Sequence, residues 1–230
     1  TLEKIIYVLT LNKAMEEEEI KAEICSVMKN LYDKNLVASL GGNVSARLPG
    51  KEYFWITPTT KFKAGLKPED LLKVSISGEL IEGKLKPSSE TKFHAAIYSV
   101  RKDVNAVVHA HNPISTALAS LGIEIKPITV NAVLTLGKLK VLEYETPGSQ
   151  ELADRIRENV GNSNVLILGN HGAVGLGKDL AEAANFVEML EEVSKINLIA
   201  FLLQSLDKRL VLKTIPEEEV KALIRYFYKE

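Results

Sequence analysis

The sequence predicts a single α/β domain in which helices cover a mixed or largely antiparallel sheet. Segments with strand and helix patterns alternate along all 230 residues, which is typical of a sheet packed against helices. Several strand segments are separated only by short turns, and such turns join antiparallel neighbours. No linker rich in Gly, Ser or Pro interrupts the chain, so we expect one domain over residues 1–230.

The first half of the chain is predicted to hold a helix, three strands and a second helix. The first helix covers about residues 15–35, because its apolar residues recur at helical spacing and four glutamates suit its N-terminal end. Strand patterns rich in aromatic and β-branched residues follow in "LGGNVSARL", "EYFWITP" and "LLKVSIS". The stretch "ELIEGKLKPSSE" suggests a hairpin or strand that leads into a helix from Ser88 to about Val100.

The second half continues the alternation. We expect strands at "NAVVHAH", "IKPITV" and "LKVLEY", and an apolar strand "NVLILGNHGAVGLG" that a Gly-Asn-His-Gly turn interrupts. Helices are predicted at "NPISTALASLG", with Pro113 in the first turn, and at "SQELADRIREN", with Ser149 as the N-cap. A long helix opens at Asp179 and runs to about Leu203, and a last helix starts near Pro216.

Composition excludes several classes of protein. The 29 basic and 30 acidic residues nearly cancel, which gives no bulk attraction to nucleic acid or to acidic membranes. The only cysteine, Cys25, leaves no internal disulfide framework and fits a reducing compartment. No apolar run approaches the roughly 20 residues of a membrane span, and no signal-peptide pattern is present, so we expect a cytoplasmic protein.

Three of the four histidines form the first candidate site. His109 and His111 share one face of a predicted strand, because strand side chains alternate. His171 lies in the glycine-flanked turn of "GNHGAVG". Three imidazoles and one carboxylate make a zinc-like ligand set with room for substrate. The alternative is that these histidines are structural, since the spacing alone does not show that the two segments meet.

The second candidate site is "KPSSETKFH". A helix N-terminus that carries the hydroxyls of Ser88 and Ser89 suits a phosphate. On the alternative interpretation, one serine is only an N-cap and Glu90 only a dipole-stabilised first-turn acid. His94 lies four residues after Glu90 on the same helix face, so these two residues are also a candidate metal pair.

The third candidate site joins "GGNVS" to "ITPTT". Its glycines permit close backbone approach, and Asn43, Thr57, Thr59 and Thr60 supply neutral donors that suit a phosphate without a basic patch. Taken alone, each stretch also fits an ordinary turn.

In combination these motifs are far more specific. The order "GGNVS", "ITPT", "KPSSE", "VVHAH", "NHG" resembles the class II aldolase/adducin family, most closely its fuculose-phosphate aldolases, from about Ile20 to Ala200. The resemblance implies a three-layer α/β/α domain with a central mixed, mainly antiparallel sheet. It also implies a cyclic homotetramer with active sites at subunit interfaces, and a C-terminal tail from about residue 205 that is mobile or lies at an interface.

The resemblance further implies the site residues. The family's metal is Zn²⁺, and its ligands here would be Glu90, His109, His111 and His171, a set that also accepts Co²⁺, Fe²⁺ or Mn²⁺. The phosphate pocket would combine Gly42, Asn43, Thr59, Thr60, Ser88 and Ser89. The enzyme would cleave a phosphorylated ketose into dihydroxyacetone phosphate and a small aldehyde through a metal-stabilised enediolate, with Glu90 as the proton shuttle.

Departures from the family pattern concern the choice of substrate. Thr60 stands where glycine is usual, and the segment Thr129–Asn131 offers no match to an interface tyrosine. Tyr226 or Tyr228 would stand in for a tail tyrosine that acts as an acid. Alternatives within the family are methylthioribulose-1-phosphate dehydratase and L-ribulose-5-phosphate 4-epimerase, although Glu90 replaces the aspartate usual in the epimerase. A non-catalytic adducin-like scaffold is the alternative of another class.

Overall fold

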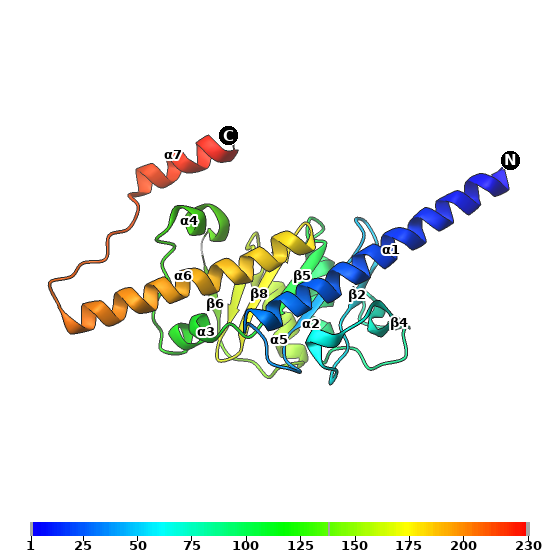
Figure 1. Ribbon diagram of the computed structural model, residues 1–230, viewed down its shortest axis with the longest axis horizontal. Helices are drawn as coiled ribbons and strands as arrows, with labels where there is room; N and C mark the ends of the chain where they lie inside the picture. The colour runs from blue at the N-terminus through cyan, green and yellow to red at the C-terminus, as the bar shows by residue number, and fades with distance from the viewer. Residues whose placement is uncertain (1, 138, 229–230) are drawn as a thin grey trace.

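The computed structural model describes residues 2–137 and 139–228, and it has a sheet between two sets of helices (Figure 1). The described residues form one eight-stranded sheet in the order β4-β3-β2-β1-β5-β8-β7-β6. Its strands are β1 (Asn43–Ala46), β2 (Tyr53–Ile56), β3 (Leu72–Ser75), β4 (Leu80–Glu82), β5 (Ala106–Ala110), β6 (Lys140–Leu142), β7 (Val165–Leu168) and β8 (Gly172–Gly177). Only the β6–β7 pair is parallel among the described strands. The predicted mixed, mainly antiparallel sheet is therefore confirmed.

Helices cover both faces of this sheet. The helices are α1 (Leu2–Asp33), α2 (Thr91–Val100), α3 (Pro113–Ser120), α4 (Val130–Leu136), α5 (Gln150–Asn159), α6 (Leu180–Leu206) and α7 (Glu217–Tyr228), with short 3-10 helices η1 (Lys63–Gly65) and η2 (Pro68–Asp70). Because strand residues alternate, Val108 packs in a core with α1, α3, α4 and α6, whereas Val107 packs in a second core with α2 and α5. The three-layer α/β/α arrangement is thus confirmed.

The predicted N-cap Ser149 and the predicted helix start at Asp179 are confirmed, whereas the predicted helix start at Ser88 is wrong. The Ser149 hydroxyl accepts a hydrogen bond from the Leu152 amide at 3.0 Å, and the Asp179 carboxylate accepts one from the Glu182 amide at 2.8 Å. The helix expected from Ser88 begins instead at Thr91, and Glu90 occupies the N-cap position without a side-chain cap bond. This leaves the Glu90 carboxylate free to face another part of the molecule.

The strand expected at "IKPITV" is also wrong. Residues up to Ile128 form a loop, and Thr129 caps α4 by accepting a hydrogen bond from the Ala132 amide at 3.2 Å. A threonine followed by a short apolar run fits both a strand and a capped helix, and packing against α6 favours the helix here. The first helix is also longer than expected, because α1 starts at Leu2.

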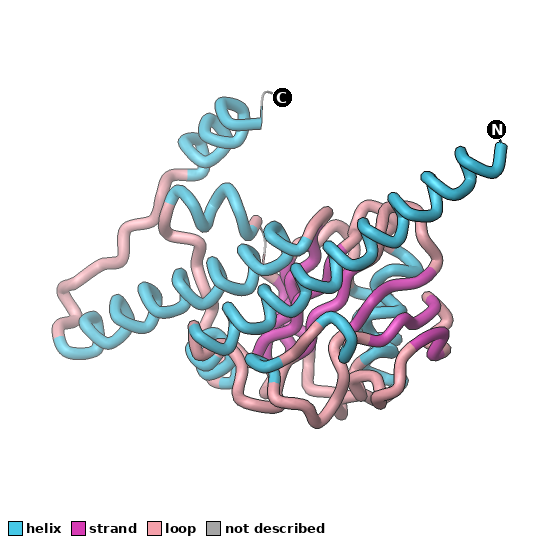
Figure 2. The backbone as a smooth tube through the Cα atoms, turned by 45° about the vertical axis from the view of Figure 1, so that its right-hand side comes forward, coloured by secondary structure: helices cyan, strands magenta, loops and turns pink. Residues whose placement is uncertain are grey.

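The C-terminal arm, residues 199–228, differs from the body of the domain. The outer turns of α6 and the loop after it stand apart from the sheet, and α7 returns to rest against α4 (Figures 1 and 2). Large apolar side chains are exposed along it, including Ile199, Phe201, Leu202, Leu203, Leu206, Leu210 and Val211. Within the described residues, no helix is both long and apolar enough to cross a bilayer.

Candidate active site

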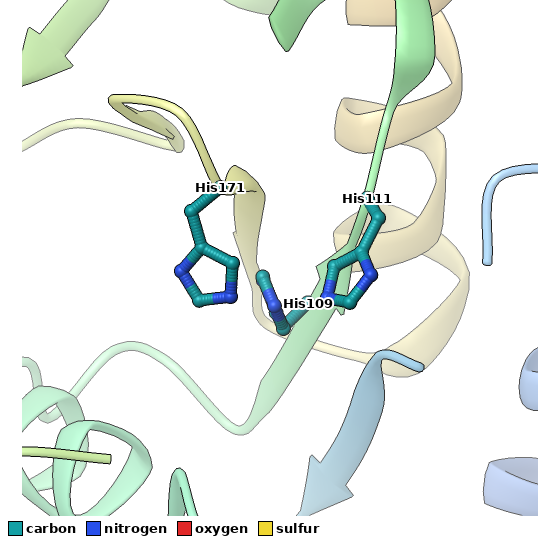
Figure 3. A group of neighbouring side chains, drawn as sticks. All are labelled: His109, His111 and His171. Carbon is teal, nitrogen blue, oxygen red and sulfur yellow. The ribbon is translucent and has the colours of Figure 1, made fainter. Parts of the chain in front are cut away.

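Three histidines from neighbouring strands meet at one end of the sheet (Figure 3). His109 lies in β5, His111 directly follows that strand, and His171 lies in the turn before β8, which pairs with β5. The ring centroid of His109 lies 5.0 Å from that of His111 and 4.7 Å from that of His171. One nitrogen of each ring lies within 4.8 Å of the others. The sheet pairing thus brings together the two segments whose meeting the sequence could not establish.

The turn that carries His171 depends on glycine. A Cβ atom on Gly172 would lie 2.2 Å from the Ala110 carbonyl oxygen, closer than any side chain tolerates. Only glycine therefore lets β8 start beside the end of β5. This close approach places His171 next to the other two rings.

The protonation state of His109 follows from its surroundings. Its Nδ1 donates a hydrogen bond to the Ala173 carbonyl oxygen at 3.0 Å, so Nε2 presents a lone pair to the cluster. Burial, with His111 and His171 nearby, holds the pKa of His109 well below its usual value. Burial also lowers the pKa of His111 and of His171. The rings are thus neutral near pH 7, which is the form that binds a metal.

Glu90 faces two of these rings from the start of α2. Its Oε2 lies 3.2 Å from Nε2 of His109, and its Oε1 lies 3.4 Å from Nε2 of His171. Its Oε2 also accepts a hydrogen bond from the amide of Asn43 at 2.8 Å. Glu90 is only 5 % exposed, so its carboxylate is shielded from solvent, whereas His111 and His171 are partly exposed.

These groups fit a divalent cation. Glu90 Oε1, His109 Nε2 and His171 Nδ1 are buried and have no hydrogen-bond partner among the described residues. A carboxylate oxygen and an imidazole lone pair that face each other in a buried space repel unless a positive charge lies between them. Three imidazoles and a carboxylate suit zinc and its neighbours in the first transition row.

The three loops of the candidate phosphate pocket are in contact. The Thr57 amide donates to the Val44 carbonyl oxygen at 3.1 Å, which joins "ITPT" to "GGNV". The Thr59 amide donates to the Lys86 carbonyl oxygen at 3.0 Å, and Pro58 pairs with Pro87 across an isolated bridge, which joins "ITPT" to "KPSSE". The three stretches that were weak signals separately therefore form one wall.

The candidate phosphate residues differ in exposure. Thr60 and Ser89 are exposed, Thr59 is partly exposed, and Gly42, Asn43 and Ser88 are buried. The two extremes of this set, Gly42 and Thr60, also have unusual backbone conformations.

Gly42 and Thr60 both adopt a left-handed φ. Gly42 has a φ of 68°, and a Cβ there would lie 2.8 Å from the His109 carbonyl oxygen, so glycine is required. Thr60 has a φ of 54°, which is strained for a β-branched residue. Glycine, which has no Cβ, would adopt this conformation freely.

Lys63 is a functional candidate that sequence reasoning missed. It is 1 % exposed, and its Nζ donates to the Pro58 carbonyl oxygen at 2.6 Å. Burial lowers its pKa to about 8, while the Glu90 carboxylate opposes this shift, and the Lys63 charge in turn lowers the pKa of His111. The ammonium thus acts on both the metal candidates and the "ITPTT" loop. Nothing in "TKFKAGL" distinguishes a buried lysine from an exposed one.

The remaining sequence candidates lie apart from the cluster. His94 is fully buried on α2 and bonds Asn43 and Ser45, so it is not among the three rings that converge. Tyr226 is 78 % exposed on α7, which rests against α4. The side chain of Tyr228 lies outside the described residues. Thr129 serves as the cap of α4.

Comparison with known proteins gives a consistent assignment. The family model for the "Class II Aldolase and Adducin N-terminal domain" matches residues 22–198. An L-fuculose phosphate aldolase of Methanocaldococcus jannaschii is 38% identical over 184 residues, which span 80% of this chain and 98% of that protein. A 3-oxo-tetronate 4-phosphate decarboxylase of Escherichia coli is 34% identical over 188 residues, or 80% of this chain and 88% of that protein.

The fold agrees with these sequence matches. A solved structure of an L-fuculose 1-phosphate aldolase aligns with a TM-score of 0.82 and 29% identity, covering 91% of this chain and 96% of that one. The similar proteins act, by their names, on different phosphorylated substrates and by different reactions. They therefore indicate the kind of site without selecting its substrate.

Proposed function

Because the chain belongs to the class II aldolase and adducin family, we propose that it is a metal-dependent aldolase that cleaves a ketose 1-phosphate. Its substrate would be similar to L-fuculose 1-phosphate, and its products would be dihydroxyacetone phosphate and a small aldehyde. The observation that carries this proposal is the Glu90 carboxylate, which faces His109 and His171 in a buried space beside three contacting loops.

Glu90, His109, His111 and His171 would hold the metal, for which Zn²⁺ is our first choice and Co²⁺, Fe²⁺ or Mn²⁺ are the alternatives. When bound, the cation supplies Lewis-acid stabilisation of the negative charge that develops on the ketose oxygens as the C3–C4 bond breaks. No Schiff-base lysine is then required.

The phosphate would bind at the wall formed by the three loops. Gly42, Asn43, Thr59, Thr60, Ser88 and Ser89 would contribute backbone amides and hydroxyls. Lys63 would add the positive charge that these neutral donors lack, since it lies directly behind Pro58. These donors would bind the phosphate group itself, which the candidate sugar phosphates share.

Glu90 would move the proton at the carbon next to the ketose carbonyl. The variant Glu90→Gln keeps the shape of the side chain and removes its basic oxygen, so it should fold, retain much of its metal and lose about 100-fold or more in proton exchange at that carbon. Incorporation of deuterium from solvent into dihydroxyacetone phosphate measures this step. An unchanged rate of deuterium incorporation would remove Glu90 from its acid–base role.

A screen of reactions tests the proposed function as a whole. The metal-loaded protein is incubated with phosphorylated ketoses, and with dihydroxyacetone phosphate plus assorted aldehydes, and the products are identified by mass spectrometry. Formation of dihydroxyacetone phosphate supports the aldolase. Loss of water, inversion at a carbon or release of carbon dioxide would identify a dehydratase, an epimerase or a decarboxylase, the last as in the named Escherichia coli relative.

We also propose that the protein is a homotetramer in the cytoplasm and binds neither nucleic acid nor membranes. The exposed apolar residues of the C-terminal arm support assembly, and the single cysteine fits a reducing compartment. A scaffold that lost its chemistry, as in adducin-like members, would not need a ligand at every metal position. Absence of a divalent ion after purification without chelator would favour that scaffold.

A further inference from the structure

A continuous hydrogen-bonded series of five buried side chains leads from the interior to Glu90. Tyr98 Oη lies 2.9 Å from Ser45 Oγ, which lies 2.7 Å from Nδ1 of His94. Nε2 of His94 lies 2.5 Å from Oδ1 of Asn43, whose Nδ2 donates to Glu90. None of the five side chains is more than 5 % exposed.

In this hydrogen-bonded series, the chemistry of each group determines which atom donates and which accepts. A carboxylate only accepts, so Asn43 turns its Nδ2 to Glu90 and its Oδ1 to His94. Nε2 of His94 must then carry the proton. Since this buried ring is neutral, its Nδ1 accepts from Ser45, whose oxygen in turn accepts from Tyr98.

The sequence arranges these residues with two simple periods. Glu90, His94 and Tyr98 follow one another at four-residue steps along one face of the start and body of α2. Asn43 and Ser45 alternate onto the same face of β1, and Asn43 pairs with His109 across the β1–β5 ladder. The hydrogen-bonded series therefore reaches the part of the sheet where the metal candidate His109 lies.

We propose that His94 is a positioning residue that fixes the Asn43 amide so that it donates to Glu90 and holds the carboxylate toward His109. The two ends of an amide have nearly the same shape, so its orientation is set by the groups that it faces: the Glu90 carboxylate on one side and the Nε2–H of His94 on the other. Without the His94 donor, the amide oxygen loses its hydrogen bond, so the Asn43 side chain is free to rotate and holds the Glu90 carboxylate less firmly toward His109. This inference rests on the proposed role of Glu90.

The first test measures the tautomer of His94 and needs no substrate. Nitrogen-15 NMR of labelled full-length protein should show His94 protonated on Nε2 and His109 protonated on Nδ1, so the two rings serve as opposite standards. The His94 signals are identified by their loss in His94→Phe. A proton on Nδ1 of His94 would overturn the proposal, whatever reaction the enzyme catalyses.

The second test uses a graded set of variants. His94→Phe keeps the ring stacked on Phe93, whose centroid lies 4.5 Å away, but removes both polar atoms. It should lower kcat about 10–100-fold and change KM little, the effect typical of outer-shell partners. His94→Gln restores a donor to Asn43 and should recover part of the loss. Ser45→Ala and Tyr98→Phe, farther along the chain, should have successively smaller effects.

A spectroscopic readout separates positioning from general destabilisation. In the Co²⁺-loaded protein, His94→Phe should shift the visible absorption in the same direction as Glu90→Gln. Ser194→Ala is the matched control. Ser194, like His94, is fully buried, and its hydroxyl donates a hydrogen bond to the Leu190 carbonyl oxygen on α6. It should lose stability without a change in the spectrum or in kcat.

The outcomes distinguish this inference from the proposed function. If the tautomers and the cobalt spectra are as expected while no ketose phosphate reacts, the proposed reaction is wrong and the positioning role of His94 stands. If an aldolase reaction is found and His94→Phe folds with an unchanged spectrum and kcat, the positioning role is wrong.

Discussion

Polar and apolar side chains are buried in opposite ways in two regions: the C-terminal arm, and the end of the sheet where His109, His111 and His171 meet, called the metal end below. At the metal end, polar side chains such as His94, His109 and Glu90 are almost completely buried. Along the arm, apolar side chains are exposed, with Leu206 at 84 % and Val211 at 77 %. Burial of a polar group costs free energy unless it finds a partner, and exposure of an apolar cluster costs free energy unless something covers it.

The difference separates the candidate metal site, whose residues all come from one chain, from the arm, whose apolar surface stays exposed. The pairing of β1, β5 and β8, together with the start of α2, brings the metal candidates close together within one chain. The arm supplies apolar surface that the described residues leave exposed. We therefore expect changes at the metal end to affect chemistry first, and changes along the arm to affect assembly first.

The largest effect is expected for His109→Ala. Removal of the central ring deletes one metal candidate and the acceptor that faces Glu90, so bound metal and turnover should both be lost. Turnover should fall about a thousandfold or more, since Lewis-acid stabilisation supplies several kcal/mol. Elemental analysis and the product assay measure the two losses.

Asn197→Ala is the matched control for His109→Ala. Asn197 is a buried polar residue on α6 that bonds the Lys126 backbone, far from the histidines in sequence and on the opposite face of the sheet. It should retain the metal. A folded His109→Ala protein with full metal content would remove His109 from the proposed ligand set.

The next largest effect concerns the arm. Leu206→Glu places a charge on the most exposed apolar residue of α6, so the proposed tetramer should dissociate while the metal content of each chain is unchanged. Light scattering measures the mass of the assembly. The matched control is Ile81→Glu. This variant alters an exposed apolar residue on β4, an edge strand of the sheet that lies outside the arm. If the Leu206→Glu protein stays tetrameric, this face of α6 is excluded from the interface.

Lys63→Met tests the buried ammonium behind the phosphate wall. At pH 7 the lysine is charged, and its loss should raise KM about 10-fold, because a charge that acts through the wall over roughly 10 Å, at an effective dielectric constant of about 20, contributes ~1–2 kcal/mol. Above the pKa of Lys63, about 8, the wild type loses its own charge and the KM difference should shrink. Lys84→Met, at an exposed lysine, is the control.

The same variant makes a prediction about stability. The folded-state pKa of Lys63 lies below its ordinary value, so the unfolded chain binds more protons between about pH 8 and 10.5. The free energy of unfolding of the wild type should therefore gain on that of Lys63→Met as the pH rises through this window. Denaturant titrations at several pH values measure the difference, and a constant difference would show that Lys63 is not a buried cation.

Sequence reasoning reached the parts of the site that depend on local periodicity. Strand alternation placed His109 and His111 on one side, and the fold class followed from the order of the elements. The contact of His171 with them depends on the pairing of β5 with β8, which is a long-range event that no local pattern records. The "IKPITV" segment was mispredicted because a threonine cap and a strand share the same residues.

Buried polar partners were the hardest part to predict. Lys63 looks like a surface residue in the sequence, since lysine is rarely fully buried, and His94 looks like a metal candidate beside Glu90 rather than a partner of Asn43. Each is buried here because a specific acceptor lies within hydrogen-bond distance, Pro58 for Lys63 and Asn43 for His94. Such matches become visible only when the strands and helices are placed side by side.

The smallest effect is expected for Thr60→Gly, and it refines the comparison within the phosphate wall. The left-handed φ of 54° costs a β-branched residue about 1–2 kcal/mol, whereas glycine adopts it freely but gives up about 0.5–1 kcal/mol in chain entropy. Thr60→Gly should therefore stabilise the fold by about 0.5–1 kcal/mol, and Thr59→Gly, at a position without a left-handed φ, should destabilise it. Thermal unfolding of both variants measures the difference. If the Thr60 hydroxyl, held by this strained backbone, selects the substrate, Thr60→Gly should accept a wider range of phosphorylated ketoses. Unchanged selectivity would show that the strained backbone has no role in the choice of substrate.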